Sequence, residues 1–306
     1  MSATVRDGIG GTDAAAIIGM HPYSTRFDVF ARIVHGAEQA SDEAGAVRME
    51  AGRYLEQFLM ERYCKKHGLE MASIRRNVEM RDTKRPYLRG EADGVASDHI
   101  VECKTVWSWR QWERWGLTKT DDIPTEYLCQ VAWYCWLADK PRAELTVLID
   151  GEIREYTYTR DRDLETKLAD AAEEFWNAHI IPQVAPPIFG AKDESVRAVY
   201  ERSNGDMRQA TAEEAKLVDC WQRLKEDAKG IAEQREHYEA QLKQSIGGMM
   251  GLHLPHGAIT WKNNADTLKI DWEKIARQLG ATAELIAQHS KTSAGARVLR
   301  FSQTKG

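Results

Sequence analysis

Two acidic residues and a lysine gather in one short stretch of the chain, residues 90–104. Asp93 lies before a turn, and Glu102 and Lys104 lie after it. Alternate side chains of a strand share a face, so Glu102 and Lys104 point the same way. If the two strands form a hairpin that closes symmetrically about residues 97–98, Asp93 lies directly opposite Glu102. The stretch therefore predicts a pair of facing carboxylates beside an ammonium group.

Facing carboxylates repel each other, and a divalent cation between them removes that penalty. Hard oxygen ligands in this number suit Mg²⁺, for which Mn²⁺ substitutes. Lys104, one pleat along from Glu102, could position a water for attack on phosphorus or stabilise the charge that develops. The alternative is a solvent-exposed polar hairpin whose charges have no function. Spacing alone leaves the two interpretations open.

The hairpin lies within a series of predicted helices and strands. Thr12 or Asp13 is the expected N-cap of the first helix. The Asp150-Gly151 pair is typical of a tight hairpin turn. Helices that flank a mixed or mostly antiparallel sheet predict an α/β or α+β core. The spacing of apolar residues predicts helices over 12–19, 47–66, 124–138 and 161–179, and strands over 74–80, 87–95, 99–105, 143–150 and 152–159.

The chain changes in character after three prolines between residues 180 and 187. We predict a core domain over residues 1–190 and a C-terminal extension over residues 191–306. The extension opens with a long helix over 211–246, whose apolar residues follow a heptad spacing interrupted by Arg235. That helix could pack on its own core or on a neighbouring protomer.

A small α+β tail is predicted after the long helix. It comprises a hairpin over 252–262, a helix that begins at the cap Asp271, and a strand near 296–302.

Composition narrows the function class. The chain has 306 residues and a formal net charge of −5, which argues against a general nucleic-acid coat but allows one basic DNA-binding groove. Its five cysteines match no zinc or iron–sulfur spacing. No apolar run is long enough to span a membrane, and the first residues lack a signal-peptide pattern, so we expect a cytoplasmic protein. Tryptophans at 107, 109, 112 and 115, interleaved with Arg110 and Arg114, could stack on bases or belong to the core.

Four motifs occur in a fixed order along the first half of the chain. They are Gly8–Gly19, Gly52–Glu56, the Glu91–Gly94 and Val101–Lys104 strands, and Tyr127–Val131. In this order the chain resembles the PD-(D/E)XK nucleases, and in particular lambda exonuclease and the YqaJ-type viral recombinases. The family's Pro or Ser-Pro before the aspartate is Glu91-Ala92 here, which puts in doubt a substrate contact carried by that position.

The resemblance implies a three-layer nuclease core and Mg²⁺-dependent hydrolysis of DNA. It implies digestion of one strand of a linear duplex from its end, 5′ to 3′, which leaves single-stranded DNA for an annealing protein. It further implies a ring-shaped homo-oligomer, such as a trimer, and a phage or prophage protein that acts in the cytoplasm of the bacterial host.

The resemblance also assigns roles within the metal site. Asp93 and Glu102 would bind the metal, with the backbone carbonyl of Cys103 as a further ligand. Lys104 would position the nucleophilic water. Glu56, by itself an ordinary charged helix residue, would join the metal site either directly or through water.

Further roles concern the substrate. Gln130 would contact a phosphate or the catalytic water. Tyr127, three residues earlier on the same helix face, would contact the DNA or its 5′-phosphate. Thr12 and Arg6 would bind a 5′-phosphate near a helix N-terminus. Helix capping is an equal alternative for Thr12.

Two other functions stay open at this point. One is a structure-selective or restriction-type endonuclease with the same core. The other is a non-catalytic DNA-binding or assembly protein on a decayed nuclease fold, against which the complete set of acidic residues and Lys104 argues.

Overall fold

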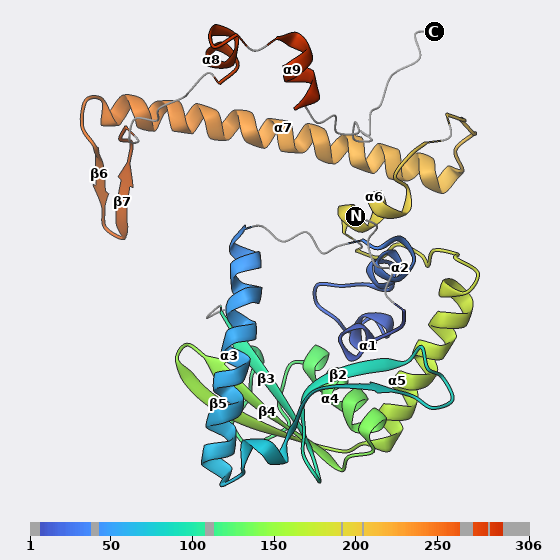
Figure 1. Cartoon of the computed structure of the whole chain (residues 1–306). Coiled ribbons are helices and arrows are strands. Elements are labelled where there is room, and N and C mark those ends of the chain that lie inside the picture. Colours follow the sequence, from blue (N-terminus) through green and yellow to red (C-terminus); the bar gives the residue numbers. More distant parts are fainter. Residues whose placement is uncertain are drawn as a thin grey trace. The chain divides into compact units, whose positions relative to one another are not determined.

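The computed structural model describes residues 7–37, 43–107, 113–190, 192–203, 205–263, 272–280 and 282–289. The chain divides into two compact units, Met1–Arg202 and Ser203–Gly306, each of which is described by itself below. Figure 1 shows the elements of both. The domain boundary expected after residue 190 stays a prediction.

The first unit is built around one mixed sheet of five strands. Its strand order is β1-β2-β3-β4-β5, and only β3 and β4 run parallel, while the other neighbours are antiparallel. Helix α4 (Thr125–Ala138) connects the parallel pair, as a parallel pair requires a crossover. The strands are β1 (Arg75–Arg81), β2 (Arg89–Val95), β3 (Ile100–Val106), β4 (Arg142–Ile149) and β5 (Glu152–Thr159).

Helices cover both faces of this sheet. Helix α3 (Glu43–His67) lies on one face, where Leu59 and Met60 pack in a cluster with Val101 of β3. The other face is covered by α4 and α1 (Gly11–Ile17), and α5 (Arg162–Phe175) packs on these two helices. The apolar residues of all three belong to the main core. The arrangement is visible in Figure 1. The predicted fold class, a mixed sheet flanked by helices in three layers, is confirmed.

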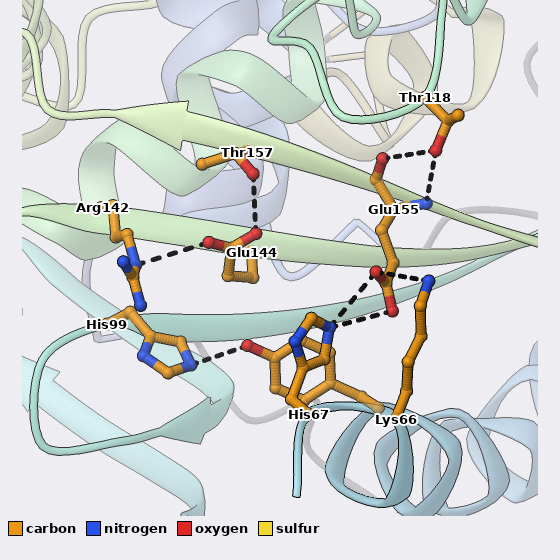
Figure 2. A network of polar contacts seen from close by, with 9 residues as sticks. Lys66, His67, His99, Thr118, Arg142, Glu144, Glu155 and Thr157 are labelled. Atoms are coloured by element: carbon orange, nitrogen blue, oxygen red, sulfur yellow. Dashed lines mark hydrogen bonds and ion pairs between the residues drawn. The ribbon is translucent and has the colours of Figure 1, made fainter.

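The C-terminal end of α3 is tied to the sheet by polar contacts (Figure 2). Lys66 Nζ donates to the Glu155 carboxylate on β5 over 2.7 Å, and His67 Nε2 lies 3.2 Å from the same carboxylate. The Tyr63 hydroxyl forms a 2.8 Å hydrogen bond with His99 Nε2. Because these contacts fix the helix against the sheet, they also fix the more N-terminal turns of α3 that carry Glu56.

Turns and caps explain several boundaries. Asp150 and Gly151 both have positive φ, 49° and 82°, as the predicted tight hairpin turn requires. The N-cap expected for the first helix is wrong. Gly10 has extended backbone and precedes α1, while Asp13 lies at the third helical position and accepts a 2.9 Å hydrogen bond from the Gly10 N–H.

Two helices of the first unit were not predicted. Helix α2 (Arg26–His35) begins at Thr25, which forms a capping box with Asp28, and ends at Gly36 in the left-handed region. The other is the short α6 (Asp193–Val199). Short turns also occur at Met71–Ser73 and at Trp176–Ile180, where α5 ends in a π-helical turn.

The second unit contains a long helix followed by small elements. Helix α7 (Ala212–Ile246) begins at the capping residue Thr211, in agreement with the predicted helix over 211–246. The hairpin β6 (Gly251–Leu254) and β7 (Gly257–Thr260) follows, and then α8 (Trp272–Gln278) and α9 (Ala283–Gln288). The predicted cap Asp271 and the strand near 296–302 lie outside the described residues. None of the described helices is long and apolar enough to cross a membrane.

Candidate functional site

The β2–β3 hairpin has the predicted register. Val95 pairs with Ile100 and Gly94 pairs with Val101, after which the ladder ends. Beyond it the two strands are joined by a side chain, because Asp93 Oδ2 accepts a 2.8 Å hydrogen bond from the backbone N–H of Cys103. Asp93 and Glu102 therefore do not form the ladder pair that the symmetrical hairpin predicted. The structure nevertheless places them close enough that the charge of Asp93 acts on Glu102.

Glu102 is the most buried of the candidate acidic residues, with 1% of its surface exposed. Its Oε1 atom accepts hydrogen bonds from Lys104 Nζ over 2.6 Å and from Gln130 Nε2 over 2.9 Å. Its Oε2 atom is buried without a hydrogen-bond partner. Burial, reinforced by the negative charge of Asp93, raises the pKa of Glu102 to about 8. A buried carboxylate with one open oxygen is costly unless a cation or donor meets it.

Lys104 stays protonated in this setting. Burial by itself would lower its pKa, but the carboxylates of Glu102 and Asp93 outweigh that effect and raise it. The ammonium Nζ also lies 5.4 Å from the ring centroid of Tyr127, which is stacked on Trp115. A permanently charged ammonium can orient a water or offset negative charge, but it cannot accept a proton.

Gln130 reaches the site from α4. It is buried, and its Nε2 donates to the Tyr134 hydroxyl over 2.9 Å as well as to Glu102. Close packing holds Tyr134 in place, because a Cβ atom at Gly11 or Gly90 would lie within 3 Å of its ring. The amide is thus aimed at the Glu102 carboxylate, so in this structure Gln130 orients a candidate ligand.

Glu56 faces the site from the other side of the sheet. Burial and the charge of Asp93 raise the pKa of Glu56, and its Oε1 lies 3.1 Å from Arg76 Nη2. Arg76 also donates to the backbone carbonyl of Asp93 over 3.0 Å. The sequence motifs gave no signal for Arg76, because its partners lie on α3 and β2 and become neighbours only in the folded sheet.

A cleft of about 590 Å³ opens beside these residues. Its lining includes Thr12, Arg53, Glu56, Arg76, Arg89 and Asp93. Thr12 is exposed at this cleft, but the neighbouring N–H of Gly10 is engaged by Asp13. Tyr127 supports Lys104 and is not among the lining residues. Arg6 lies outside the described residues.

The residues fit a hydrated divalent ion better than a closed metal cage. Within the described ranges, no three histidine, cysteine or acidic side chains converge as a ligand cluster. Mg²⁺ needs no such cluster, since it keeps several waters and binds through one or two carboxylates. The open Oε2 of Glu102 beside Asp93 suits this binding mode. Cys103 could offer only its carbonyl, because its thiol packs in the apolar cluster under α3 and burial raises its pKa.

The tryptophan-rich segment is described only in part. Trp115 is buried, while Trp107 is 50% exposed. Arg114 is paired with Glu126 over 2.6 Å. Residues 108–112, which include Trp109, Arg110 and Trp112, lie outside the described residues. Trp115 therefore belongs to the core, and base stacking stays a hypothesis for Trp107.

Known proteins resemble this chain over its core and beyond. Residues 3–141 match the family model of the YqaJ-like viral recombinase domain. The chain is 24% identical over 293 residues to the uncharacterized protein YqaJ of Bacillus subtilis, with 89% of each sequence covered.

Among solved structures, the fold is similar to the exonuclease LHK-Exo in complex with dAMP, an alkaline exonuclease from Laribacter hongkongensis. That likeness has 16% identity, covers 60% of this chain and 92% of the other, and has a TM-score of 0.47. A phage-related exonuclease from Haemophilus somnus 129PT is 18% identical, with 57% and 96% coverage and a TM-score of 0.44. The family model that matches residues 3–141 is the one that the order of the four motifs pointed to.

Proposed function

We propose that this protein is a Mg²⁺-dependent DNA exonuclease of phage-type recombination. The observation that supports this most is that Asp93 lies near the buried Glu102, whose Oε2 lacks a partner, beside the charged Lys104. The match of residues 3–141 to a viral recombinase family model supports DNA as the substrate. Mn²⁺ is expected to replace Mg²⁺, because both take oxygen ligands in octahedral geometry.

The chain's own residues have distinct tasks in this proposal. Asp93, Glu102 and the carbonyl of Cys103 would hold the ion, with Glu56 joining directly or through water. When bound, the ion supplies Lewis-acid activation of the scissile phosphate and an activated water. Lys104 would orient that water or offset charge at the phosphate, since its ammonium is held 2.6 Å from Glu102.

The remaining contacts concern the environment of the reaction. Gln130 would keep Glu102 aligned and contact a phosphate or the catalytic water. Thr12 and Arg6 would bind the 5′-phosphate of a DNA end, and Tyr127 would act near the DNA through its support of Lys104. Cleavage would run 5′ to 3′ on linear duplex in the bacterial host cytoplasm, by a ring-shaped homo-oligomer such as a trimer. A single-strand annealing protein would receive the product strand.

A direct test uses end-labelled linear duplex with a 5′-phosphate or a 5′-hydroxyl, next to covalently closed circular duplex. We expect cleavage of linear DNA in Mg²⁺, preference for the 5′-phosphate, no cleavage after chelation, and an intact circle. Cleavage of the circle would instead support the endonuclease alternative. Binding of DNA without cleavage in either metal would support the non-catalytic alternative.

The role of Lys104 is tested in the same assay by Lys104→Ala. Because the ammonium acts on the reacting groups, we expect cleavage to fall by at least about a hundredfold. DNA affinity in the presence of Ca²⁺, measured by fluorescence anisotropy, should change little. Full cleavage by the variant would refute this role.

A further inference from the structure

The Arg76 side chain on β1 donates hydrogen bonds to three groups on α3 and β2, two of which belong to candidate site residues. Its Nε donates to the Asp93 carbonyl over 3.0 Å, its Nη1 to Gln57 Oε1 over 3.1 Å, and its Nη2 to Glu56 Oε1 over 3.1 Å. We infer that Arg76 is a positioning residue that sets Glu56 beside Asp93 and so completes the metal site. The inference rests on the proposed function.

The reason lies in where these groups originate. Glu56 is on α3, which covers the sheet, whereas Asp93 is on β2 within the sheet. A glutamate on a helix surface has many rotamers, and ordering it costs side-chain entropy. The planar guanidinium fork of Arg76 bonds both elements at once, which selects one position for the Glu56 carboxylate. The contact engages Oε1 of Glu56 and leaves Oε2 as the oxygen that Glu56 can offer to the ion.

The backbone next to Arg76 is unusual in the same place. Arg76 pairs with Gly94 and Val78 pairs with Ala92, but Asn77 between them is not paired, and its φ is 47°. A non-glycine residue in the left-handed region is uncommon inside a strand, and such outliers concentrate at functional sites. Asn77 lies opposite Asp93, so the backbone of β1 is distorted at the residue that follows Arg76.

A competing explanation is that Arg76 contacts a DNA phosphate directly, because it also lines the cleft. The two explanations differ in what they predict without DNA. A positioning residue changes metal affinity in the free protein, whereas a phosphate contact changes DNA affinity and reduces its dependence on salt concentration.

The experiment measures Mn²⁺ affinity of the full chain without DNA, by electron paramagnetic resonance of the free ion. The variants are Arg76→Met, Glu56→Gln and the double variant. We expect each single change to weaken Mn²⁺ binding by about tenfold or more, as supporting groups of metal ligands do. The double variant should bind no more weakly than Glu56→Gln alone, because Arg76 acts through Glu56.

Two further variants control for charge and folding. Arg75→Met changes the exposed neighbour on the same strand and should leave Mn²⁺ affinity unchanged. Arg76→Lys keeps the charge but loses the planar fork, so we expect it to restore little of the affinity. Thermal unfolding of every variant identifies any that is unfolded, and Arg76→Lys then carries the test in place of Arg76→Met.

Several outcomes overturn the inference: unchanged Mn²⁺ affinity in both Arg76 variants, full affinity in Arg76→Lys, or independent losses that add in the double variant. A drop in DNA affinity with a shallower salt dependence and unchanged Mn²⁺ affinity assigns Arg76 to phosphate instead. Cleavage by the wild type is measured in parallel. If the variants show the expected coupling between Arg76 and Glu56 in Mn²⁺ affinity but the wild type cleaves no DNA, the nuclease proposal fails and the positioning role stands.

Discussion

At the scale of single residues, Glu102 governs how the site responds to pH. Burial and the negative charge of Asp93 raise its pKa toward about 8, so a proton competes with a metal ion for this carboxyl in the neutral pH range. A metal must displace that proton before the carboxylate can ligate. We therefore expect the apparent Mg²⁺ affinity to rise by about tenfold per pH unit up to roughly pH 8 and then to level off.

Isothermal titration with Mg²⁺ from about pH 6 to about pH 9 measures this dependence. The linked stability effect provides a second check. A carboxyl whose pKa is raised by folding stabilises the folded state while protonated, so the free energy of unfolding of the metal-free protein should fall as the pH rises through about 8. A Mg²⁺ affinity that is flat over this range would contradict the proposed role of Glu102.

Residue patterns could predict part of this site and not the rest. Asp93, Glu102 and Lys104 could be predicted, because strand alternation and a short turn determine which side chains meet. The hydrogen bond from the Cys103 N–H to the Asp93 side chain could not be predicted, because it forms where the ladder ends. The role of Arg76 could not be predicted from the sequence, since the residues it contacts are 17 to 20 positions away along the chain.

At the scale of elements, the packing of α4 on the sheet supports the site. Trp133 of α4 is fully buried, and its indole N–H donates to the Arg89 carbonyl of β2 over 2.8 Å. Trp133→Ala should lower the free energy of unfolding of the first unit by about 3–5 kcal/mol, because it leaves a large cavity and an unpaired carbonyl. Chemical denaturation followed by circular dichroism measures the change.

The matched control is Trp107→Ala, since Trp107 is half exposed. We expect a change within about 0.5 kcal/mol there. Equal losses in both variants would mean that α4 does not hold the core in the way described.

The elements also show how far periodicity predicts a fold. Long segments with clear hydrophobic spacing, such as α3, α4 and α7, were predicted within a few residues of their bounds. Helix α2 was missed although the capping box of Thr25 and Asp28 was present in the sequence. The N-cap of α1 was misassigned because two polar residues follow two glycines, and only the extended backbone at Gly10 shows where the helix begins.

At the scale of the whole molecule, every candidate site residue that the structure describes lies in the first unit, Met1–Arg202. A chain that ends at Arg202 should therefore fold cooperatively and keep the Mg²⁺ affinity of the full protein, because the sheet and its covering helices are complete in it. Thermal unfolding and Mg²⁺ titration test this. A truncated chain that folds but no longer binds Mg²⁺ would show that the second unit contributes to the site.

Helix α7 bears on the open question of assembly. Leu217, Leu224, Ile231 and Tyr238 on its heptad stripe are each more than 60% exposed. No described residue of the second unit covers them. The stripe is compatible with either interpretation raised by the sequence, packing on the chain's own core or on a neighbouring protomer.

The central claim is that Asp93 and Glu102 together bind the divalent ion that cleavage needs. The most direct measurement titrates Mg²⁺ into the wild type, Asp93→Asn, Glu102→Gln and the control Glu91→Gln, an exposed residue of the same cleft. We predict saturable binding by the wild type and the control, with binding and cleavage of linear duplex both lost in the Asp93 and Glu102 variants. Undiminished Mg²⁺ binding and cleavage in either of those two variants would contradict the account.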